Sequence, residues 1–547
     1  MSSTFDGIYI ARSGVQTARA NLNVTGQNIS NAGTDGYTRQ RVSQSAVPPT
    51  GIDMLYAALS TSCGEGVSTD GIEQLRDKFL DGQYRTQNAQ CGSTSTLLSA
   101  LQDIEDALNE TSSDGIDASV SALIEQLEGL TSTGSSDANE STVKEAASLL
   151  ASKLNTAADQ LSTIRKQQYG SLGEYGVDKV NTVLTNIANL NEKIKDAEVA
   201  GSPALELTDQ RNTLIDELSQ YANIRVETTQ EEIGSGKKVD TLSIYLADSE
   251  GNLQTSKYLY TGKDGTQHVG QSKPVCLVSG GKAGKLEAGG SQSEAEINVT
   301  DADGDLCGFV KRHEDNSPYL ENSNGLFEGG SLDSYLKLLN ESGEFDGAGT
   351  AATRGIGYYE KMLDTVAQKL AEVMNADNST NDAGDNKPLF TDSDGNTANI
   401  TAANIRISPD WESGYLTLSK DGSNAGDDTS GSNSNISKMI SDLASTEYTI
   451  SGGGQDLFTG SIQEAFSNIS LALGQHIGSI GAQDTANGSM LDNIDTRRAA
   501  LSSVDINEEA VNLIVFNQAL AASSRFMTTV DECIDTIINS MGIAGRG

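Results

Sequence analysis

The sequence predicts a multidomain α+β protein. A long α-helical coiled-coil or bundle stalk is built from both chain ends and carries an inserted β-rich domain. Three observations support this fold class: a seven-residue apolar repeat near each terminus, further helical repeats between residues 90 and 220, and alternating apolar and polar residues from about residue 221. With 547 residues the chain is too long for one ordinary hydrophobic core, so two to four domains are expected.

The first helix is expected from about residue 8 to Asn31. Asn31-Ala32-Gly33 and then Asp35-Gly36 form a cluster typical of turns, which ends the helix. Small residues in its repeat indicate close approach of a partner helix. The repeat has the alternating three- and four-residue spacing of a coiled-coil seam and comprises Ile8, Ala11, Val15, Ala18, Leu22, Thr25 and Ile29.

A second helix of this kind is expected near the C-terminus. Asp505 or Asn507 can cap its start, and Glu508 and Glu509 lie in its first turn, where negative charge is favourable. An unpartnered helix would bury none of its seam, so we expect each terminal helix to be frayed until it meets a partner, first of all the other terminus. The seam comprises Leu513, Phe516, Leu520, Ser523, Met527, Val530, Ile534, Ile537 and Met541.

Between the ends, helical repeats at residues 150–164, 183–194 and 207–220 predict a bundle of long helices. From residue 221 the pattern changes, and residues 238–246 followed by the turn Asp248–Asn252 predict a β-hairpin. One helix is expected within the sheet region, over residues 358–375, and helical pattern resumes at 461–483. The expected domains are an N-terminal helix with its exit turn (1–50), the first part of the helical bundle (51–220), an inserted β-rich outer domain (221–460), the second part of the bundle (461–504) and a C-terminal helix (505–547).

Composition excludes several classes of function. The net charge of −39 argues against a nucleic-acid partner, which would need clustered Lys and Arg. No apolar run is long enough for a membrane span or a signal peptide, so no membrane insertion is expected and these rules alone indicate a soluble, cytoplasmic protein. The five cysteines are odd in number and widely spaced, which indicates neither a disulfide framework nor a zinc motif.

No motif for catalysis, a cofactor or a metal stands out. Residues 280–286, GGKAGKL, have one residue too few between the glycines for a phosphate-binding loop. Residues 301–306 and 391–396 resemble the start of a calcium loop, but both lack the glycine and the glutamate at the required later positions. Only three histidines are present. We therefore expect no enzyme, no cofactor and no metal site.

Both ends of the chain resemble the flagellar rod, hook and hook-associated protein family. At the N-terminus, SGVQTARANLNVTGQNISNAGTDGYTRQ (residues 13–40) follows the family pattern, and its ending, GYTRQ, is similar to the subgroup at the junction of hook and filament. At the C-terminus the helix from residue 504 has the family form, with two glutamates, Asn512-Leu513, Gln518-Ala519 and Arg525. Asp35, Gly33 and Gln27 depart from the family pattern and put the detail of the turn in question.

The resemblance implies a structural subunit whose terminal helices pair as the inner coiled-coil layer of a tubular assembly, in a ring joining hook to filament. It implies as partners other copies of the chain, the hook protein, the second hook–filament junction protein, the flagellar export apparatus and a chaperone for the C-terminal helix. It also replaces the cytoplasmic interpretation, because family members are exported through the flagellar channel without a cleaved signal peptide and lie outside the cell.

Two alternatives remain open at this stage: a hook or distal rod subunit, and a flagellar subunit with an enzymatic insert. The N-terminal residues expected to serve assembly are Ile8, Val15, Leu22, Asn28, Ile29, Asn31, Gly36, Tyr37, Arg39 and Gln40. The C-terminal ones are Glu508, Glu509, Leu513, Phe516, Leu520, Arg525, Met527, Val530, Ile534 and Ile537.

Overall fold

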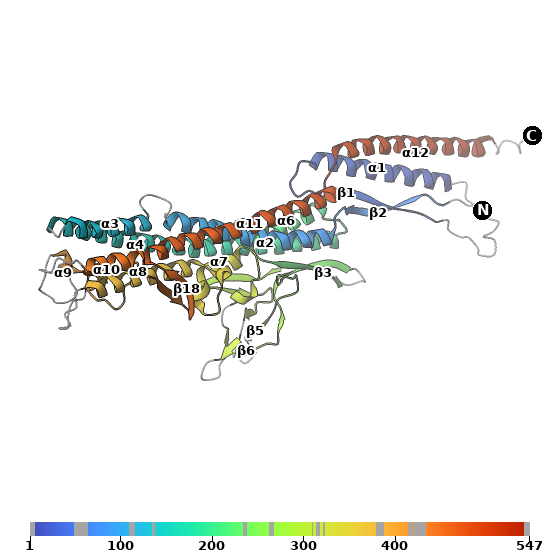
Figure 1. Cartoon of the computed structure of the whole chain (residues 1–547). Coiled ribbons are helices and arrows are strands. Elements are labelled where there is room, and N and C mark those ends of the chain that lie inside the picture. The colour runs from blue at the N-terminus through green and yellow to red at the C-terminus, as the bar shows by residue number, and fades with distance from the viewer. Residues whose placement is uncertain are drawn as a thin grey trace, which may run out of the picture.

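The structure, a computed structural model, shows an elongated helical body with a separate pair of terminal helices at one end and sheets along one side (Figure 1). This arrangement confirms the predicted fold class, because sheets from the middle of the chain are inserted between helices from its two ends. The described residues are 6–48, 64–108, 115–133, 137–232, 238–261, 267–308, 310–312, 318–320, 323–378, 388–413, 418 and 434–540.

The two terminal helices lie side by side and run in opposite directions (Figure 1). They are α1 (Asp6–Asn31) and α12 (Ile506–Ser540), close to the predicted bounds. A hairpin that the sequence analysis did not predict, β1 (Gln40–Ala46) with β2 (Val67–Gln74), packs on α1. The N-terminal helix is therefore covered from two sides, by α12 and by the hairpin.

The helical body is built as expected from long helices whose apolar repeats face inward. The predicted seam residues Leu150, Leu154 and Leu161 are fully buried, as is Ile187. Helix α11 lies along α2, so the late part of the chain closes the bundle (Figure 1). The helices are α2 (Lys78–Leu108), α3 (Ile116–Thr133), α4 (Asp137–Ser171), α5 (Lys179–Val199), α6 (Leu205–Tyr221) and α11 (Ile462–Ser502).

Helices α4 and α5 are joined by a π-helical segment, η2 (Leu172–Asp178), so that they form one long helix. The wider turn places Leu172, Gly176 and Val177 in the core. A β-carbon at Gly176 would lie 2.8 Å from the Cδ2 atom of Leu332. Glycine at this position therefore lets helix α7 (Ser331–Asn340), which contains Leu332, approach closely.

Two antiparallel sheets lie beside the body. The first has the order β3-β4-β8-β9 and the second the order β10-β11-β12-β5-β6, with β7 paired to β5. Their strands are β3 (Ile224–Glu232), β4 (Lys238–Leu246), β5 (Thr255–Thr261), β6 (Gln267–Val269), β7 (Lys273–Pro274), β8 (Cys276–Ser279), β9 (Lys282–Ala283), β10 (Lys285–Gly290), β11 (Ala295–Thr300) and β12 (Leu306–Gly308).

The predicted hairpin at Asp248–Asn252 is wrong in its pairing. The turn forms, but beyond it β4 and the following strand share only the bridge between Ala247 and Leu253. One edge of β4 is paired with β3 and the other with β8, so β5 turns away and joins the second sheet.

The region between residues 323 and 460 contributes helices to the body as well as short hairpins. The expected helix is α8 (Ile356–Asn378), with Met362, Val366 and Leu370 fully buried as predicted. Helices α7 (Ser331–Asn340) and α10 (Ser434–Ala444) were not predicted. Smaller elements are β13 (Val310–Arg312), β14 (Pro318–Leu320), η3 (Asn324–Leu326), η4 (Gly343–Asp346), η5 (Ala351–Thr353), β15 (Phe390–Thr391), β16 (Arg406–Ile407), α9 (Pro409–Glu412), β17 (Tyr448–Gly452) and β18 (Gln455–Gly460).

Candidate assembly surface and its joint to the body

The terminal helices approach each other closely at two glycines. A β-carbon at Gly7 would lie 3.2 Å from both methyl groups of Val530, and one at Gly14 would lie 2.8 Å from the Oγ atom of Ser523. The two contacts are seven residues apart on each helix, and the residue numbers rise on α1 while they fall on α12. This spacing is the repeat of an antiparallel coiled coil. The predicted small seam residues are present, and Ala11 is buried, but the glycines lie one position before the predicted seam.

Most predicted seam residues lie at this contact or beside it, half-buried. Leu513 and Ile537 are exceptions, with 40% and 43% of their surfaces exposed. A strict seven-residue repeat drifts around a straight helix by roughly 20° per repeat, which rotates Leu513 out of the contact. Ile537 lies one repeat beyond Val530, past the start of α1 as described. The half-buried seam residues are Ile8, Val15, Leu22, Ile29, Phe516, Leu520, Met527, Val530 and Ile534.

The exit turn after α1 is organised by Asn28, a buried side chain. Its amide nitrogen donates to the carbonyl of Gln40 at 3.0 Å, and its Oδ1 atom accepts from the Gln40 backbone N–H at 3.0 Å and from the Tyr37 hydroxyl at 2.9 Å. Burial raises the pKa of Tyr37 to about 12, so its hydroxyl stays protonated and donates. Asn31 bonds locally: its side chain donates to the Gln27 carbonyl and accepts from the Thr34 hydroxyl. The predicted Asn, Tyr and Gln therefore tie the end of α1 to the first strand.

The same turn is seated against helix α6. Gly36 has a φ of +75°, and a β-carbon there would lie 2.3 Å from the Oγ1 atom of Thr213, so glycine is required for both backbone and space. The buried Thr38 donates its backbone N–H to the Oδ2 atom of Asp209 at 3.1 Å. Burial raises the pKa of the Asp209 carboxyl, although the bond to Thr38 acts against that shift.

Arg39 connects the exit strand to the start of α12, and we call its contacts with Glu508 and Glu509 the clamp. Its Nε atom lies 2.8 Å from Glu509, its two Nη atoms bind both oxygens of Glu508 at 3.0 and 2.8 Å, and its backbone N–H donates to the Ser502 carbonyl at 2.8 Å. The Glu509 side chain is only 2% exposed. The sequence analysis placed the two glutamates at the helix N-terminus; the structure adds that they hold an arginine from the opposite end of the chain. The predicted Arg525 is exposed on α12.

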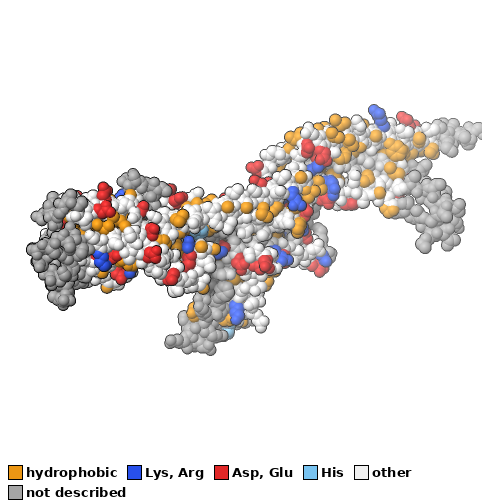
Figure 2. Space-filling model, viewed as in Figure 1, with side chains coloured by type: hydrophobic (Ala, Val, Ile, Leu, Met, Phe, Trp, Pro, Cys, Tyr) orange, Lys and Arg blue, Asp and Glu red, His pale blue; other side chains and the backbone are white. Residues whose placement is uncertain are grey.

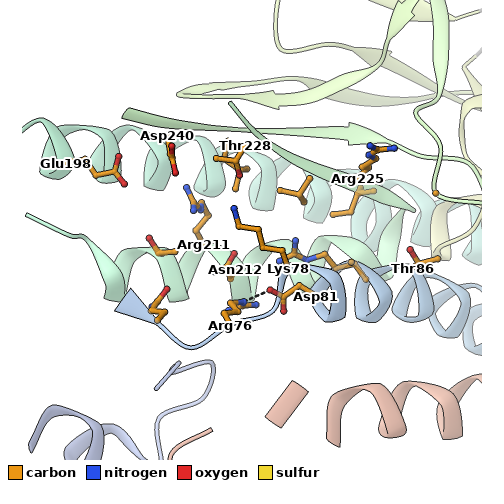
Figure 3. Close-up of a pocket in the computed structure, with 18 residues that line it drawn as sticks. Arg76, Lys78, Asp81, Thr86, Glu198, Arg211, Asn212, Arg225, Thr228 and Asp240 are labelled. Atoms are coloured by element: carbon orange, nitrogen blue, oxygen red, sulfur yellow. Dashed lines mark hydrogen bonds and ion pairs between the residues drawn. The ribbon is translucent and has the colours of Figure 1, made fainter. Parts of the chain in front are cut away.

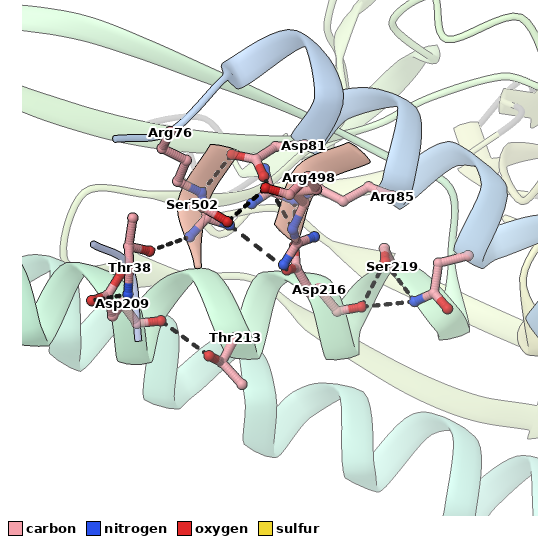
Figure 4. Close-up of polar contacts among 11 residues, drawn as sticks. Thr38, Arg76, Asp81, Arg85, Asp209, Thr213, Asp216, Ser219, Arg498 and Ser502 are labelled. Atoms are coloured by element: carbon pink, nitrogen blue, oxygen red, sulfur yellow. Dashed lines mark hydrogen bonds and ion pairs between the residues drawn. The ribbon is translucent and has the colours of Figure 1, made fainter. Parts of the chain in front are cut away.

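A cluster of five charged side chains, which we call the joint, links three helices of the body next to this clamp (Figure 4). Asp216 of α6 accepts from Arg85 Nε at 2.8 Å and from Arg498 Nη2 at 2.7 Å, while Asp81 pairs with Arg76 and lies 3.6 Å from Arg498 Nε. Arg76 also donates to the hydroxyl of Thr38 at 3.5 Å, which ties the joint to the exit turn.

The joint was not predicted from the sequence. Its acidic and basic residues lie far apart in the chain, with 282 positions between Asp216 and Arg498. The available signal was the predicted helix over 207–220, which did not indicate a charge cluster.

The described residues contain no group of three or more His, Cys, Asp or Glu side chains arranged to hold a metal ion, and no described helix is long and apolar enough to cross a membrane. In one of the two acidic loops noted above, the Lys273 ammonium lies 2.5 Å from Asp301 and 2.8 Å from Asp305. In the other, Asp392 accepts the backbone N–H groups of Asp394 and Asn396. The first loop is thus paired with a lysine from β7, and the second is held by its own backbone.

Comparison with known proteins first identifies the class of protein. The family model described as "Flagella basal body rod protein" matches residues 8–38, and "Flagellar basal body rod FlgEFG protein C-terminal" matches residues 500–541. These matches cover most of α1 and all of α12, so the terminal helices are those of a flagellar rod- and hook-type structural subunit.

A family model that matches the middle of the chain then identifies the family. The model "Flagellar hook-associated protein FlgK helical domain" matches residues 101–388, more than half of the chain. The chain therefore belongs to the flagellar hook-associated protein 1 family, a family of structural flagellar proteins rather than enzymes.

Individual relatives agree with this family. "Flagellar hook-associated protein 1" of Bacillus subtilis is 27% identical over 565 aligned positions that cover all of both chains. The protein of the same name from Salmonella typhimurium is 28% identical over 40% of this chain and 38% of its own. Among solved structures, "the flagellar hook junction protein FlgK from Burkholderia pseudomallei" is 21% identical, with a TM-score of 0.38 over 58% of this chain and 45% of that one.

Proposed function

We propose that copies of this chain form the ring that joins the flagellar hook to the filament, by coiled-coil packing of their terminal helices against neighbouring subunits. The N-terminal and C-terminal assembly residues named above act in this packing. Within the proposed domain division, residues 1–50 and 505–547 form the assembly layer, residues 51–220 and 461–504 form the body, and residues 221–460 form the inserted outer domain, whose helices α8 and α10 pack against the body.

One observation carries this proposal. Helix α12 has a second apolar stripe beside its contact with α1, and large side chains of this stripe are exposed: Val511 by 60%, Val515 by 50% and Phe526 by 45%. Phe526, at one edge of the stripe, borders α1, whereas Val511 and Val515 lie further from it. Ala519 and Ala522 lie on the same face at helical spacing. Figure 2 shows apolar side chains gathered along this end of the molecule.

The stripe supports packing between copies for an energetic reason. A fully buried Val or Phe side chain contributes about 1.5–3 kcal/mol, so burying the stripe in a neighbour gives a substantial gain that the isolated chain does not obtain. Contiguous exposed apolar surface of this kind marks interaction sites. The proposed partners are other copies of this chain, the hook protein and the second junction protein, with the export apparatus and a chaperone for the C-terminal helix before assembly. The proposed location is outside the cell, after export without a cleaved signal peptide.

The test introduces charge on the stripe without disturbing the contact with α1. Val511→Asp combined with Val515→Asp, produced in a flagellated strain lacking its own copy of the gene, should leave hooks without filaments in electron micrographs. The purified variant should retain the circular dichroism and monomeric elution of the parent, because both side chains are already exposed.

Thr528→Asp, an exposed change elsewhere on the same helix, is the matched control and should support filaments. Normal filament numbers with the double variant would show that the stripe is not an assembly surface.

A further inference from the structure

A pocket of about 480 Å³ lies between the start of α2, helix α6 and the first sheet (Figure 3). It is separate from the apolar stripe of α12, and no role for it follows from the proposed function. Its wall combines backbone and side chains from the body with strands β3 and β4, so it is formed by the folded body rather than by one flexible loop.

The wall of this pocket is rich in positive charge, although the chain as a whole carries a net charge of −39. Five basic side chains and three carboxylates line it. The carboxylates are Asp81, Glu198 and Asp240, and the basic residues are Arg76, Lys78, Arg85, Arg211 and Arg225.

Three of the five basic groups have carboxylate partners at contact distance. Arg76 pairs with Asp81, Arg85 with Asp216 of the joint, and Arg225 with Glu227 at 3.2 Å. These three basic groups therefore have a structural role, and their positive charge is largely balanced by the neighbouring carboxylates.

Lys78 and Arg211 differ from the other three. Within the described residues neither has a carboxylate oxygen within 4.0 Å, and Figure 3 shows both extending toward the same part of the pocket. Arg211 donates from Nη1 to Asn191 at 3.0 Å, while its Nε atom is buried without a hydrogen-bond partner. Burial lowers the pKa of Arg211 to about 10, with Arg85 and Arg76 adding to the shift and Glu198 opposing it.

A buried guanidinium donor without an acceptor is costly, and an acceptor with negative charge removes that cost. Guanidinium groups bind carboxylate and phosphate oxygens through several N–H groups at once, and an ammonium adds a mobile point charge. The geometry points to an oxyanion-binding site in this pocket, with Lys78 and Arg211 as its ligands.

The oxyanion has two sources with the same chemistry: a free ion such as inorganic phosphate, or a carboxylate side chain of a second copy of this chain, which contains 76 Asp and Glu residues. Either source is independent of the apolar stripe, so failure of this inference leaves the proposed ring packing untouched.

The first experiment titrates inorganic phosphate into the purified full-length chain by isothermal calorimetry, with chloride adjusted to hold ionic strength constant. Saturable binding at one site per chain is expected. Lys78→Gln should weaken it about tenfold or more, as the loss of one charge-assisted contact implies. Lys78 is exposed, so this variant is expected to fold.

Lys179→Gln is the matched control, because it removes an equal charge from an exposed position on the body and should leave binding unchanged. Arg211→Lys, which keeps the charge and removes the guanidinium, should also weaken binding, and circular dichroism checks its fold.

The second experiment measures self-association of the chain by sedimentation velocity with and without phosphate. If the oxyanion is a neighbour's carboxylate, phosphate and Lys78→Gln both reduce self-association; if it is a free ion, neither does and calorimetric binding remains. The inference is overturned if phosphate does not saturate and Lys78→Gln leaves self-association unchanged, or if Lys78→Gln and Lys179→Gln have equal effects.

Discussion

Replacing Asp216 by Asn tests whether the joint holds the body together. The carboxylate is 12% exposed and accepts hydrogen bonds from Arg85, 8% exposed, and Arg498, 19% exposed. The substitution keeps the shape and one neutral acceptor but removes the negative charge between the two guanidinium groups. Arg85 then loses its carboxylate partner, and Arg498 keeps only the longer contact with Asp81, at 3.6 Å.

The size of the effect follows from burial. Removing one partner from a buried ion pair costs about 3–5 kcal/mol, and a hydrogen bond to a charged group contributes about 1.5–3 kcal/mol. Because the asparagine oxygen still accepts one bond, we expect the low end, a loss of about 3 kcal/mol in the free energy of unfolding.

Urea unfolding followed by circular dichroism at 222 nm measures this loss, and amide hydrogen exchange locates it. The exchange should accelerate in the parts of α2, α6 and α11 that meet at the joint. Urea is suitable because, unlike guanidinium chloride, it does not screen ion pairs.

Glu217→Gln is the control, one position further along α6. Glu217 pairs with Lys179 at 2.8 Å, but both side chains are substantially exposed, at 34% and 46%. Exposed pairs contribute about 0.2–1 kcal/mol, so this variant should change stability little. Equal losses for the two variants would refute the view that the joint is a buried network on which the body depends.

Two further predictions concern the body and the terminal pair. Burial raises the pKa of Glu341 to about 7 from 4.5, so the folded state binds the proton more tightly; its contribution to stability is present below pH 4.5 and is lost as the pH rises through 7. The urea midpoint of the parent should decrease between pH 5 and pH 8, and Glu341→Gln should make this decrease smaller. An equal decrease in the variant would show that another group causes it. Gly14→Val should weaken the contact of α1 with α12 by about 1–3 kcal/mol through overpacking against Ser523. Hydrogen exchange in α12 should then rise, whereas Gly26→Val, where a β-carbon meets nothing within 4 Å, should leave α12 unchanged; a similar rise in both variants would count against close packing at Gly14.

Local chemistry made the terminal helices and the exit turn predictable. A heptad repeat requires only the order of residues along one helix, and a turn at Gly36 requires only its neighbours. Asn28, Tyr37 and Gln40 lie within 13 residues of one another, so the contacts they make are encoded in one short stretch.

Contacts between distant segments were not predictable in this way. The hairpin of β1 and β2 contains few apolar residues, and in β1 only Gln40 and Val42 are buried, so its alternation is weak. Charged residues in a helical pattern usually lie on a solvated face, and nothing local distinguishes Asp216 from Glu217. Only the packing of three helices shows that Asp216 is enclosed and Glu217 is not.

The joint and the clamp also set an order for folding. Arg39 and Glu509 are 470 residues apart, and Gln87 of α2 bonds Asn487 of α11 across 400 residues. Contacts of such high contact order form late, because a long loop must close before they contribute. Helix α2 gains its partner α11 only after nearly the whole chain has been synthesised. During synthesis α2 can pack on α6 and α7, but the body can be closed only after its last helices have left the ribosome.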